Sequence, residues 1–558
     1  MDKMLFIFFV MHFLIANAQE NIPSNKGRIL GPFVWKSKIF AGTERNYWIY
    51  VPSQYDPAKP ACLMVVQDGL SRAMGWRLPT VLDSLIALKE VPVMIGIFID
   101  PGIVSSTGIG NFPRYNRSFE YDALGPKYAL FLLEEILPEV SRSYNLSNDP
   151  DDRSIAGASS GAICAFNVAW ERPDAFHRVF SSIGTYVGLR GANEFPTLIR
   201  KSEPKPLRIF LQDGTRDNNI YAGDWWVANQ DMLSAFSWAG YEVNHAWGEG
   251  GGHDSRHTVS ILADALKWLW KDYPARVKTH ADSTVRINPI LKEERWKEMP
   301  LNKVEAEKIA INKNGDLFFT GKQSIYKYQN GETILFATLK GNMGGISFHN
   351  DDKLYVCDLV HHKIISIDIK GRQQEVVQNV NAALLTITNY GIYFTESGKH
   401  HVGFYSFSGK QIQYFIVPGY PTALAISAEQ TFMNVGFDNH QLGYSFKIMS
   451  DGNLSYGQDY IHYHLPYGSA TPAVSAMVAD TSNLLYSATS SGIQMSDQLG
   501  RVNLIISRPA DPISDLKFGG PGFNFLYASC KGKLFQRKLN TKGIVSWMGP
   551  VKPPQPRL

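Results

Sequence analysis

Two patterns of hydrophobic residues divide the chain. Between about residues 27 and 275, short uninterrupted apolar runs, such as 62–66 and 207–211, alternate with longer stretches of helical spacing, such as 128–140 and 257–270. Apolar runs separated by helices are typical of a mostly parallel sheet that is covered on both faces. Residues 27–275 are therefore predicted to form an α/β domain.

A shorter repeat replaces this pattern further along the chain. Each unit has an apolar or aromatic strand, a small or polar break, a second alternating strand and a glycine turn, as in 317–331. The first strands begin at residues 317, 354, 392, 432, 485 and 526. A repeat of about 40 residues made of strands alone is typical of propeller blades, whereas a two-sheet sandwich would not repeat so regularly. Residues 300–550 are predicted to form a six-bladed β-propeller, joined by a polar linker over 276–299.

Composition narrows the class of protein. The chain has 558 residues, of which 44% are hydrophobic and 19% are charged, as in packed globular proteins. Lys and Arg exceed Asp and Glu by only 55 to 51, an excess too small to indicate a nucleic-acid surface. Four cysteines stand far apart inside apolar runs, so we expect buried free thiols rather than disulfides or zinc ligands. They are Cys62, Cys164, Cys357 and Cys530.

The first residues resemble an export signal. Lys3 precedes an apolar run over 4–16, and Ala16-Asn17-Ala18 has the small-x-small pattern of a signal-peptidase site. The run is shorter than the ~20 residues that a membrane-spanning helix needs. We expect a signal peptide over 1–18 that is cleaved after Ala18. The mature protein is then expected to be secreted or periplasmic, with no integral membrane segment.

A candidate nucleophile lies between a predicted strand and a predicted helix. The segment Gly157-Ala-Ser159-Ser-Gly161 follows the apolar residues 154–156 and precedes the helical stretch 162–170. The G-x-S-x-G pattern alone is weak evidence, but between strand and helix its small residues permit the sharp turn that exposes a serine hydroxyl. Ser159 is therefore predicted to be the nucleophile of acyl transfer. The alternative is a tight joint without chemistry.

A nucleophilic serine requires an acid and a histidine later in the chain. Two carboxylates, Asp213 and Asp217, follow an apolar strand. Asp217 is favoured because the turn carries its side chain toward the sheet edge, and Asp213 remains the alternative. His253 follows three glycines, whereas His257 is assigned to the start of the last helix. The predicted catalytic triad is Ser159, Asp217 and His253.

The oxyanion of an acyl-transfer reaction needs two N–H donors. One is expected to be the backbone N–H of Ser160, which follows the nucleophile. The other comes from a loop after an early strand, and the segment 65–70 places the N–H of Leu70 there.

These residues resemble the enterochelin esterase and esterase D branch of the α/β-hydrolases, which includes carbohydrate esterases that remove feruloyl or acetyl groups. The resemblance covers about residues 30–273, and it rests on the motifs 66–69, 92–101, 117–122, 132–138, 157–161 and 251–253. It implies Ser159, Asp217 and His253 as the catalytic residues. The family's basic residue falls on Arg117. That side chain is expected either to bind an anionic or hydroxyl-rich substrate or to pair with Glu120 or Asp122.

Aromatic residues follow the candidate acid. Tyr221, Trp225 and Trp226 could stack on a sugar or an aryl acyl group, and Trp225 is the predicted substrate-binding residue. Core packing of at least one tryptophan is the alternative.

The repeat region resembles the gluconolactonase and regucalcin propellers. That resemblance implies an axial divalent cation held by a glutamate, asparagines or similar groups, and an aspartate. Only the carboxylate of Glu307 is kept at these positions; the others are Gly344-Gly345, Ala383-Leu384, Pro421-Thr422-Ala423 and Ser475. Such groups cannot replace the hydration shell of a cation. We therefore predict no metal, no cofactor and no lactonase chemistry in the propeller.

The favoured hypothesis is an exported serine esterase that acts through an acyl-enzyme on acyl esters of carbohydrates. Its propeller would be a scaffold, or a binding face for carbohydrate or a protein partner. One alternative is a siderophore trilactone esterase. A second is a working lactonase or sugar-binding propeller with a supporting esterase-like domain. A pair of binding modules without turnover and acyl transfer to an alcohol also remain open.

Overall fold

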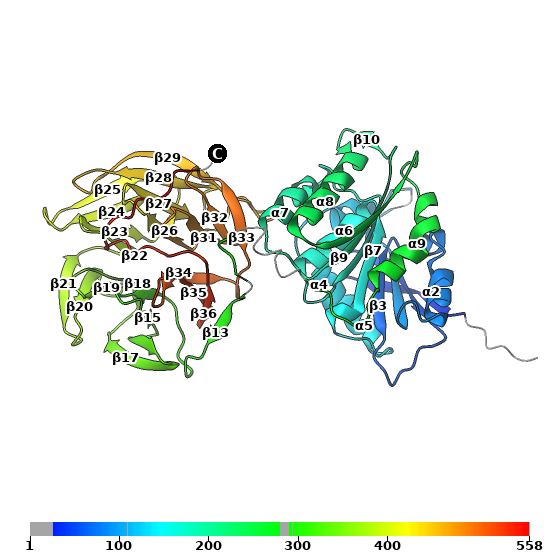
Figure 1. Ribbon diagram of the computed structural model, residues 1–558, viewed down its shortest axis with the longest axis horizontal. Helices are drawn as coiled ribbons and strands as arrows, with labels where there is room; N and C mark the ends of the chain where they lie inside the picture. Colours follow the sequence, from blue (N-terminus) through cyan, green and yellow to red (C-terminus); the bar gives the residue numbers. More distant parts are fainter. Residues whose placement is uncertain (1–25, 109, 279–288, 293, 557–558) are drawn as a thin grey trace, which may run out of the picture.

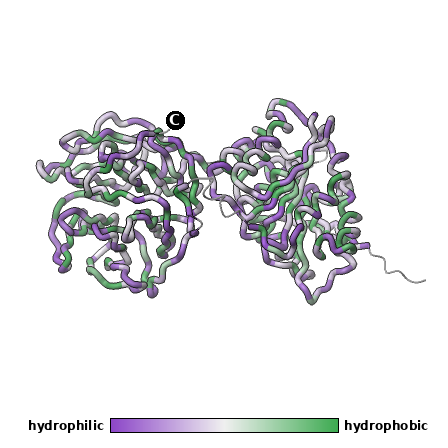
Figure 2. The backbone as a smooth tube through the Cα atoms, viewed as in Figure 1, coloured by the Kyte–Doolittle hydropathy of each residue, from purple (hydrophilic) through white to green (hydrophobic). Residues whose placement is uncertain are grey.

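The computed structural model describes residues 26–108, 110–278, 289–292 and 294–556. They form two lobes, an α/β domain followed by a propeller, as predicted (Figure 1). Hydrophobic residues occur throughout the interior strands of both lobes (Figure 2). The predicted signal peptide lies outside the described residues. Within those residues, no helix is both long enough and apolar enough to cross a membrane.

The α/β domain is built on one large mixed sheet. Its strand order is β12-β9-β8-β7-β3-β4-β2-β5-β6, with β1 paired to β2. The six strands from β12 to β4 are parallel, and the strands beyond them are antiparallel. The strands are β1 (Arg28–Lys36), β2 (Glu44–Val51), β3 (Cys62–Gln67), β4 (Met94–Ile99), β5 (Ile103–Val104), β6 (Arg114–Tyr115), β7 (Arg153–Ala158), β8 (Arg178–Ser182), β9 (Arg208–Gly214) and β12 (Glu242–Gly248). A separate hairpin joins β10 (Asn219–Ile220) to β11 (Gly223–Asp224).

Helices cover both faces of this sheet because its central strands are apolar on both sides. In β3, Leu63 and Val65 pack with α4, α5, α6 and α8, whereas Met64 and Val66 pack with α1, α2 and α9. The α-helices are α1 (Gly69–Gly75), α2 (Leu78–Ala87), α3 (Arg117–Tyr121), α4 (Lys127–Phe131), α5 (Leu137–Ser141), α6 (Ser160–Glu171), α7 (Phe195–Lys201), α8 (Trp225–Ala239) and α9 (Arg256–Leu269). The predicted α/β class is confirmed.

Six four-stranded sheets form the propeller, so the predicted blade number is confirmed. The blades are β14 (Ile309–Ile311) to β17 (Glu332–Thr338), β18 (Met343–Phe348) to β21 (Gln373–Gln378), β22 (Ala382–Ile387) to β25 (Ile412–Ile416), β26 (Pro421–Ile426) to β29 (Leu454–His462), β30 (Ala476–Ala479) to β33 (Val502–Ile506), and β34 (Ile513–Gly519) to β36 (Lys533–Lys538) with β13 (Lys297–Met299). Their second and third strands are β15 (Leu317–Thr320), β16 (Ser324–Gln329), β19 (Leu354–Asp358), β20 (Lys363–Ile367), β23 (Gly391–Glu396), β24 (His401–Ser406), β27 (Phe432–Phe437), β28 (Leu442–Ile448), β31 (Leu485–Thr489) and β32 (Gly492–Ser496), with β35 (Phe525–Cys530) in the last blade.

The two ends of the propeller sequence meet in its last blade. Strand β13 pairs antiparallel with β36, with Lys297 opposite Gln536 and Met299 opposite Leu534. Residues 297–299 are predicted to belong to the linker, but in the structure they form the outer strand of a blade. This pairing closes the ring, because it ties the start of the propeller to its end.

The C-terminal segment crosses one end of the propeller axis (Figure 1). Residues 544–547 line an axial cavity of about 70 Å³ together with innermost-strand residues of all six blades. Trp547 is buried in a hydrophobic cluster that includes Phe318 and Phe348. The N–H of Ile544 donates to the carbonyl of Ala479 at 3.1 Å. The segment therefore belongs to the folded propeller.

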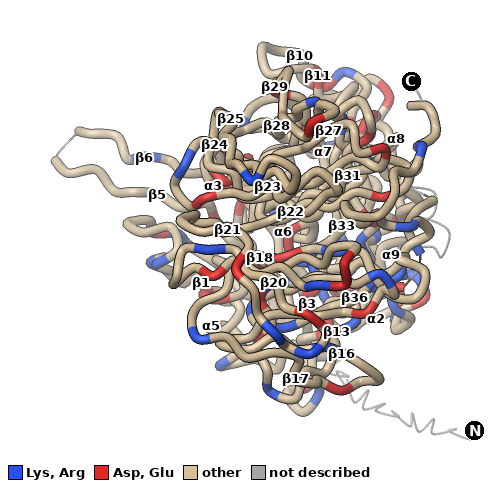
Figure 3. The backbone as a smooth tube through the Cα atoms, turned by 90° about the vertical axis from the view of Figure 1, so that its left-hand side faces the viewer, with Lys and Arg blue, Asp and Glu red and all other residues tan. Residues whose placement is uncertain are grey.

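A buried ion pair joins the two lobes. Glu203, just after α7, accepts hydrogen bonds from Arg537 of β36 at 2.6 and 3.0 Å, and both side chains are buried. Arg295 and the N–H of Ser507 add donors at 2.7 and 2.9 Å. Burial alone would raise the pKa of Glu203, but the hydrogen bonds and charges of the arginines outweigh burial and hold that pKa below its usual value. Elsewhere, Lys and Arg residues alternate with Asp and Glu residues along the backbone (Figure 3).

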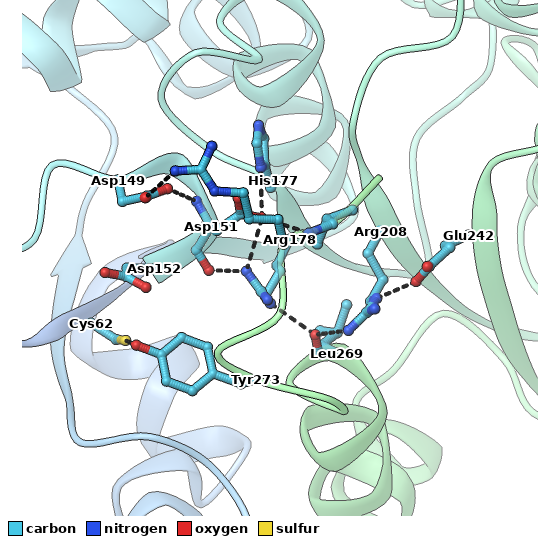
Figure 4. Close-up of polar contacts among 12 residues, drawn as sticks. Cys62, Asp149, Asp151, Asp152, His177, Arg178, Arg208, Glu242, Leu269 and Tyr273 are labelled. Carbon is cyan, nitrogen blue, oxygen red and sulfur yellow. Dashed lines mark hydrogen bonds and ion pairs between the residues drawn. The ribbon is translucent and has the colours of Figure 1, made fainter. Parts of the chain in front are cut away.

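Charged side chains close the edge of the α/β sheet at which its parallel strands begin (Figure 4). Arg178 and Arg208, the first residues of β8 and β9, donate to the carbonyl of Leu269 at 2.9 and 3.2 Å. His177 Nδ1 lies 2.9 Å from Asp151 Oδ1. Because helix C-termini attract cations, this cluster anchors the end of α9. It stands at the opposite edge from the turn that carries Ser159.

Candidate active site

Ser159 lies at a sharp turn between β7 and α6, as the motif predicts. Its backbone has φ 58° and ψ −124°, a conformation that turns the side chain off the sheet edge. A Cβ on Gly157 would lie 2.1 Å from the carbonyl oxygen of Gly161. A Cβ on Gly161 would approach Gln67 and Asp68, at 3.0 and 3.2 Å. Glycine is therefore required at 157 and leaves little room for a side chain at 161, because the strand, the helix and the loop after β3 meet here.

The loops that carry Asp217 and His253 are joined by their backbones. The N–H of Arg216 donates to the carbonyl of Gly251 at 2.9 Å, and the N–H of Thr215 donates to that of Gly248 at 3.0 Å. A Cβ on Gly214 would come within 2.3 Å of the Gly251 oxygen. This close approach follows from the parallel pairing of β9 with β12, whose ends lie side by side.

The structure brings the three predicted triad residues into one hydrogen-bonded line. His253 Nε2 lies 2.9 Å from Ser159 Oγ, and His253 Nδ1 lies 2.6 Å from Asp217 Oδ1. The His253 side chain is 24% exposed, whereas the Asp217 side chain is fully buried. This is the geometry in which a carboxylate orients an imidazole and the imidazole takes a proton from a serine.

The pKa values of the two candidate acids are shifted in opposite directions. Burial would raise the pKa of Asp217, but hydrogen bonds from His253, Asp213 and the Asn218 N–H lower it. Burial, followed by the hydrogen bond and charge of Asp217, raises the pKa of Asp213 to about 9. Among the described residues, the carboxylate that hydrogen-bonds to His253 is that of Asp217, so the geometry favours Asp217 over Asp213 as the partner of the histidine.

The two predicted oxyanion donors stand in the first turns of helices. Ser160 is the first residue of α6, and Leu70 is the second residue of α1. N–H groups in a first turn lack partners inside the helix, so they are available to an anion. The contact of Gly161 with Gln67 and Asp68 shows that the two helix starts lie close to one another. The assignment of these donors stays a prediction.

Arg117 lies beside Ser159 but has a different partner from those proposed. Its Nε and Nη2 donate to the carboxylate of Asp68 at 2.6 and 2.9 Å, and its Nη2 lies 3.4 Å from the carbonyl of Ala158. The predicted pairing with Glu120 is wrong, because Glu120 forms a buried ion pair with Arg45. The Arg117 side chain keeps 36% exposure, so it can still contact a bound molecule.

Trp225 supports the triad instead of offering an open stacking face. It is 3% exposed, its ring lies 5.9 Å from that of His253 at 81°, and its Nε1 donates to Thr185 at 3.2 Å. This corrects its predicted role as a stacking residue in substrate binding. Trp226 packs edge-on against Trp247, and Tyr221 is 92% exposed on the β10–β11 hairpin. Of the three aromatic residues, Tyr221 has the free face.

Sequence reasoning missed two residues of this site. Thr185 Oγ1 lies 3.2 Å from Ser159 Oγ, and Asp68 holds Arg117. Both follow the carboxyl ends of parallel strands, β8 and β3, where site residues gather in such sheets. That position was the available signal: Asp68 lies within the motif 66–69 but was given no role there, and Thr185 lies outside the quoted motifs.

The cysteines take no part in this arrangement. All four are buried and free, as predicted. Burial raises the pKa of Cys62 to about 12, which makes its thiol a poor nucleophile at neutral pH.

The propeller positions that would hold an axial cation gather where the innermost strands begin. Glu307 is exposed, and the hydroxyl of Thr422 donates to the carbonyl of Val474. The Ser475 hydroxyl lies 3.5 Å from the carbonyl of Ala488. In the part of the chain that the structure describes, no three His, Cys, Asp or Glu side chains stand together as a metal site. The absence of a metal stays a prediction.

Gly157→Ala is expected to lower esterase activity by at least ~100-fold, because displacing a reacting group by about 1 Å can cost that much. The added Cβ would collide with backbone atoms of Gly161, which cannot move without shifting Ser159. Activity on p-nitrophenyl acetate and the thermal midpoint measure the effect. Gly75→Ala is the control, since its Cβ meets nothing within 4 Å. Equal activity of the two variants would contradict this account of the turn.

Comparison with known proteins finds similarity to esterases in the first half of the chain. Residues 37–287 match the family model described as "Putative esterase". An Iron(III) enterobactin esterase from Dickeya dadantii (strain 3937) is 28% identical over 250 residues, which cover 42% of this chain and 53% of that protein. The chain thus spans about half the length of this curated relative.

Solved structures resemble each half of the chain. A ferulic acid esterase is 19% identical and covers 44% of this chain and 99% of its own, with a TM-score of 0.36. A gluconolactonase from Xanthomonas campestris is 16% identical and covers 42% and 86%, with a TM-score of 0.38. The predicted resemblances are confirmed, and residues 37–287 match the esterase family model.

Proposed function

We propose that the protein is an exported serine esterase that cleaves acyl esters of carbohydrates through an acyl-enzyme. The observation that carries the proposal is the hydrogen-bonded line from Ser159 through His253 to Asp217, at 2.9 and 2.6 Å. The esterase family match supports ester hydrolysis. The signal-like residues 1–18 support export to a secreted or periplasmic location.

The proposed reaction has two steps. Ser159 Oγ attacks the ester carbonyl carbon while its proton passes to His253 Nε2, and Asp217 stabilises the imidazolium. The N–H groups of Leu70 and Ser160 stabilise the oxyanion. The bond between the carbonyl carbon and the alkoxy oxygen of the ester then breaks, and the alcohol leaves with the proton from His253. Water attacks the acyl-serine by the same route and releases the acid and the free enzyme.

The proposed substrate class rests on the site and on export. Tyr221 offers an open aromatic face, and Arg117 offers a partly exposed guanidinium that is held in place by Asp68. An aromatic face and a fixed hydrogen-bond donor suit an aryl acyl group or a sugar. A siderophore trilactone is the second candidate, favoured by the similarity to an Iron(III) enterobactin esterase. We infer that the propeller is a scaffold or a carbohydrate- or partner-binding face.

Covalent labelling and substrate profiling test the proposal. A fluorophosphonate is expected to modify Ser159 in the native chain, and peptide mass spectrometry locates the adduct. His253→Ala is expected to remain unlabelled although it keeps Ser159, because the hydroxyl is no longer activated. An equally labelled His253→Ala would contradict the proposed activation. Comparing kcat/KM for feruloyl, acetyl and glucuronoyl sugar esters with that for a catecholate trilactone then distinguishes the two substrate classes.

Calcium binding tests the alternative in which the propeller is the working part. Titration calorimetry with calcium chloride on the full chain measures it. Stoichiometric binding, together with loss of lactonase turnover in chelator, would favour a propeller enzyme and contradict the assignment of activity to Ser159.

A further inference from the structure

The proposed reaction does not use the carboxyl group of Asp213, which lies near the end of β9. Asp213 is fully buried, and its Oδ1 accepts the N–H of Gly214 at 2.8 Å. Its other oxygen, Oδ2, is buried and has no hydrogen-bond partner among the described residues. The same is true of Oδ2 of Asp217, the acid of the triad. Two buried acceptor oxygens without donors therefore belong to neighbouring acids.

One shared proton accounts for both oxygens. Buried carboxylates side by side cannot both ionise, since each charge raises the free energy of the other. A proton on one acid turns one of the two acceptors into a donor, and both oxygens then have a partner. Buried polar atoms in folded proteins are nearly always paired in this way.

The surroundings decide which acid holds the proton. Asp217 faces the His253 ring and the Asn218 N–H, which stabilise a negative charge on it. Asp213 lies beside Asp217 and the amide of Asn229 on α8, and its pairing partner on the adjacent strand β12 is Trp247. Asn229 and Trp247 carry no charge, and His253 hydrogen-bonds to Asp217. The neutral acid is therefore Asp213, which agrees with the opposite pKa shifts of the two groups.

We propose that Asp213 is a neutral carboxylic acid at neutral pH and that its Oδ2–H donates to Asp217 Oδ2, which positions the triad carboxylate for His253. Asp213 is thus a positioning residue and does not touch the substrate. The expected effect of Asp213 on catalysis rests on the proposed function. The protonation of Asp213 is a property of the folded chain and can be tested without turnover.

The first test compares variants of the two acids by activity. Asp213→Asn keeps a donor, because its amide N–H can replace the O–H, and it is expected to retain kcat/KM within about fivefold. Asp213→Ala removes the donor and is expected to lose ~10–50-fold. Asp217→Asn is expected to lose ~10⁴-fold, as the equivalent change does in other triads. Asp264→Asn, an exposed site on α9, is the control. A loss in Asp213→Asn as large as that in Asp217→Asn would overturn the proposal.

The second test follows pH. The pKa of about 9 for Asp213 predicts that wild-type kcat/KM falls as the pH rises through 9, where ionised Asp213 repels Asp217. Asp213→Asn should lack this alkaline fall. A fall of the same size in both proteins would assign it to another group and contradict the proposal.

The third test needs no activity and separates this proposal from the proposed function. An unfolded aspartate ionises near pH 3.9, whereas folded Asp213 keeps its proton up to about 9. Folding of the wild type therefore takes up a proton between these values and becomes less favourable as the pH rises. The thermal midpoint of Asp213→Asn should exceed that of the wild type increasingly from pH 4 to 9. A difference independent of pH would overturn the proposal, even in a protein that hydrolyses esters.

Discussion

Ser159→Ala is expected to lower kcat/KM for p-nitrophenyl acetate by ~10⁴–10⁶-fold. The change removes the atom that forms the acyl-enzyme, and loss of a triad serine elsewhere costs about 2 × 10⁶ in kcat. His253, 2.9 Å away, then has no hydroxyl to activate. The residual rate would come from the oxyanion donors and from binding alone. A spectrophotometric assay of both proteins measures the ratio.

The fold is expected to survive this substitution. Alanine keeps the backbone N–H that donates to Ser182, and only one oxygen is removed. Equal thermal midpoints of the variant and the wild type are therefore expected. Ser260→Ala, which removes a hydroxyl from the exposed side of α9, serves as the matched control and should keep full activity. Wild-type turnover in Ser159→Ala would eliminate the esterase mechanism.

Glu203→Ala is expected to destabilise the folded chain by about 3–5 kcal/mol, the usual effect of removing one partner of a buried ion pair. The substitution leaves the guanidinium of Arg537 buried without its carboxylate. The urea midpoint and calorimetry measure the loss, and the two lobes should unfold more independently. Arg295→Ala is the control: the Arg295 side chain is 48% exposed, and its pairing with Glu203 should contribute below about 1 kcal/mol.

The pH dependence of this ion pair has a definite sign. The pKa of Glu203 is lower in the folded chain than the ~4.3 of an unfolded glutamate. Its contribution is present above pH ~4.3 and is lost as the pH falls through the folded pKa. The difference in stability between wild type and Glu203→Ala should therefore shrink in acid. A difference that grows in acid would contradict the assignment of the pKa shift to the arginines.

The sequence was a reliable guide where function depends on a local pattern. The turn at Ser159 follows from its glycines, because a Cβ at either position would collide with the backbone or crowd the neighbouring loop. The chain order of Ser159, Asp217 and His253 follows from loops that leave the same edge of a parallel sheet. The blades could be predicted from the sequence because each repeats one hydrophobic pattern.

Contacts between distant segments were less predictable. Arg117 pairs with Asp68, 49 residues away, rather than with a neighbour on its own helix, because the order of strands in the sheet brings the two loops together. Trp225 is buried against His253, although its sequence position suggested an exposed aromatic beside the acid. Exposure depends on which elements cover a side chain, and no local pattern specifies them.

By itself, the amino-acid sequence determined the α/β lobe, the six blades and the identity of the three residues in the hydrogen-bonded line. Hydrophobic periodicity and glycine placement act over a few residues, so they can be read without coordinates. Only the tertiary structure decided that β13 closes the propeller, that Glu203 joins the lobes and that the carboxyl groups of Asp213 and Asp217 lie next to each other. Each of these contacts depends on burial and on pairing between different helices, strands and loops. The free energy that stabilises them comes from groups that meet only after the chain has folded.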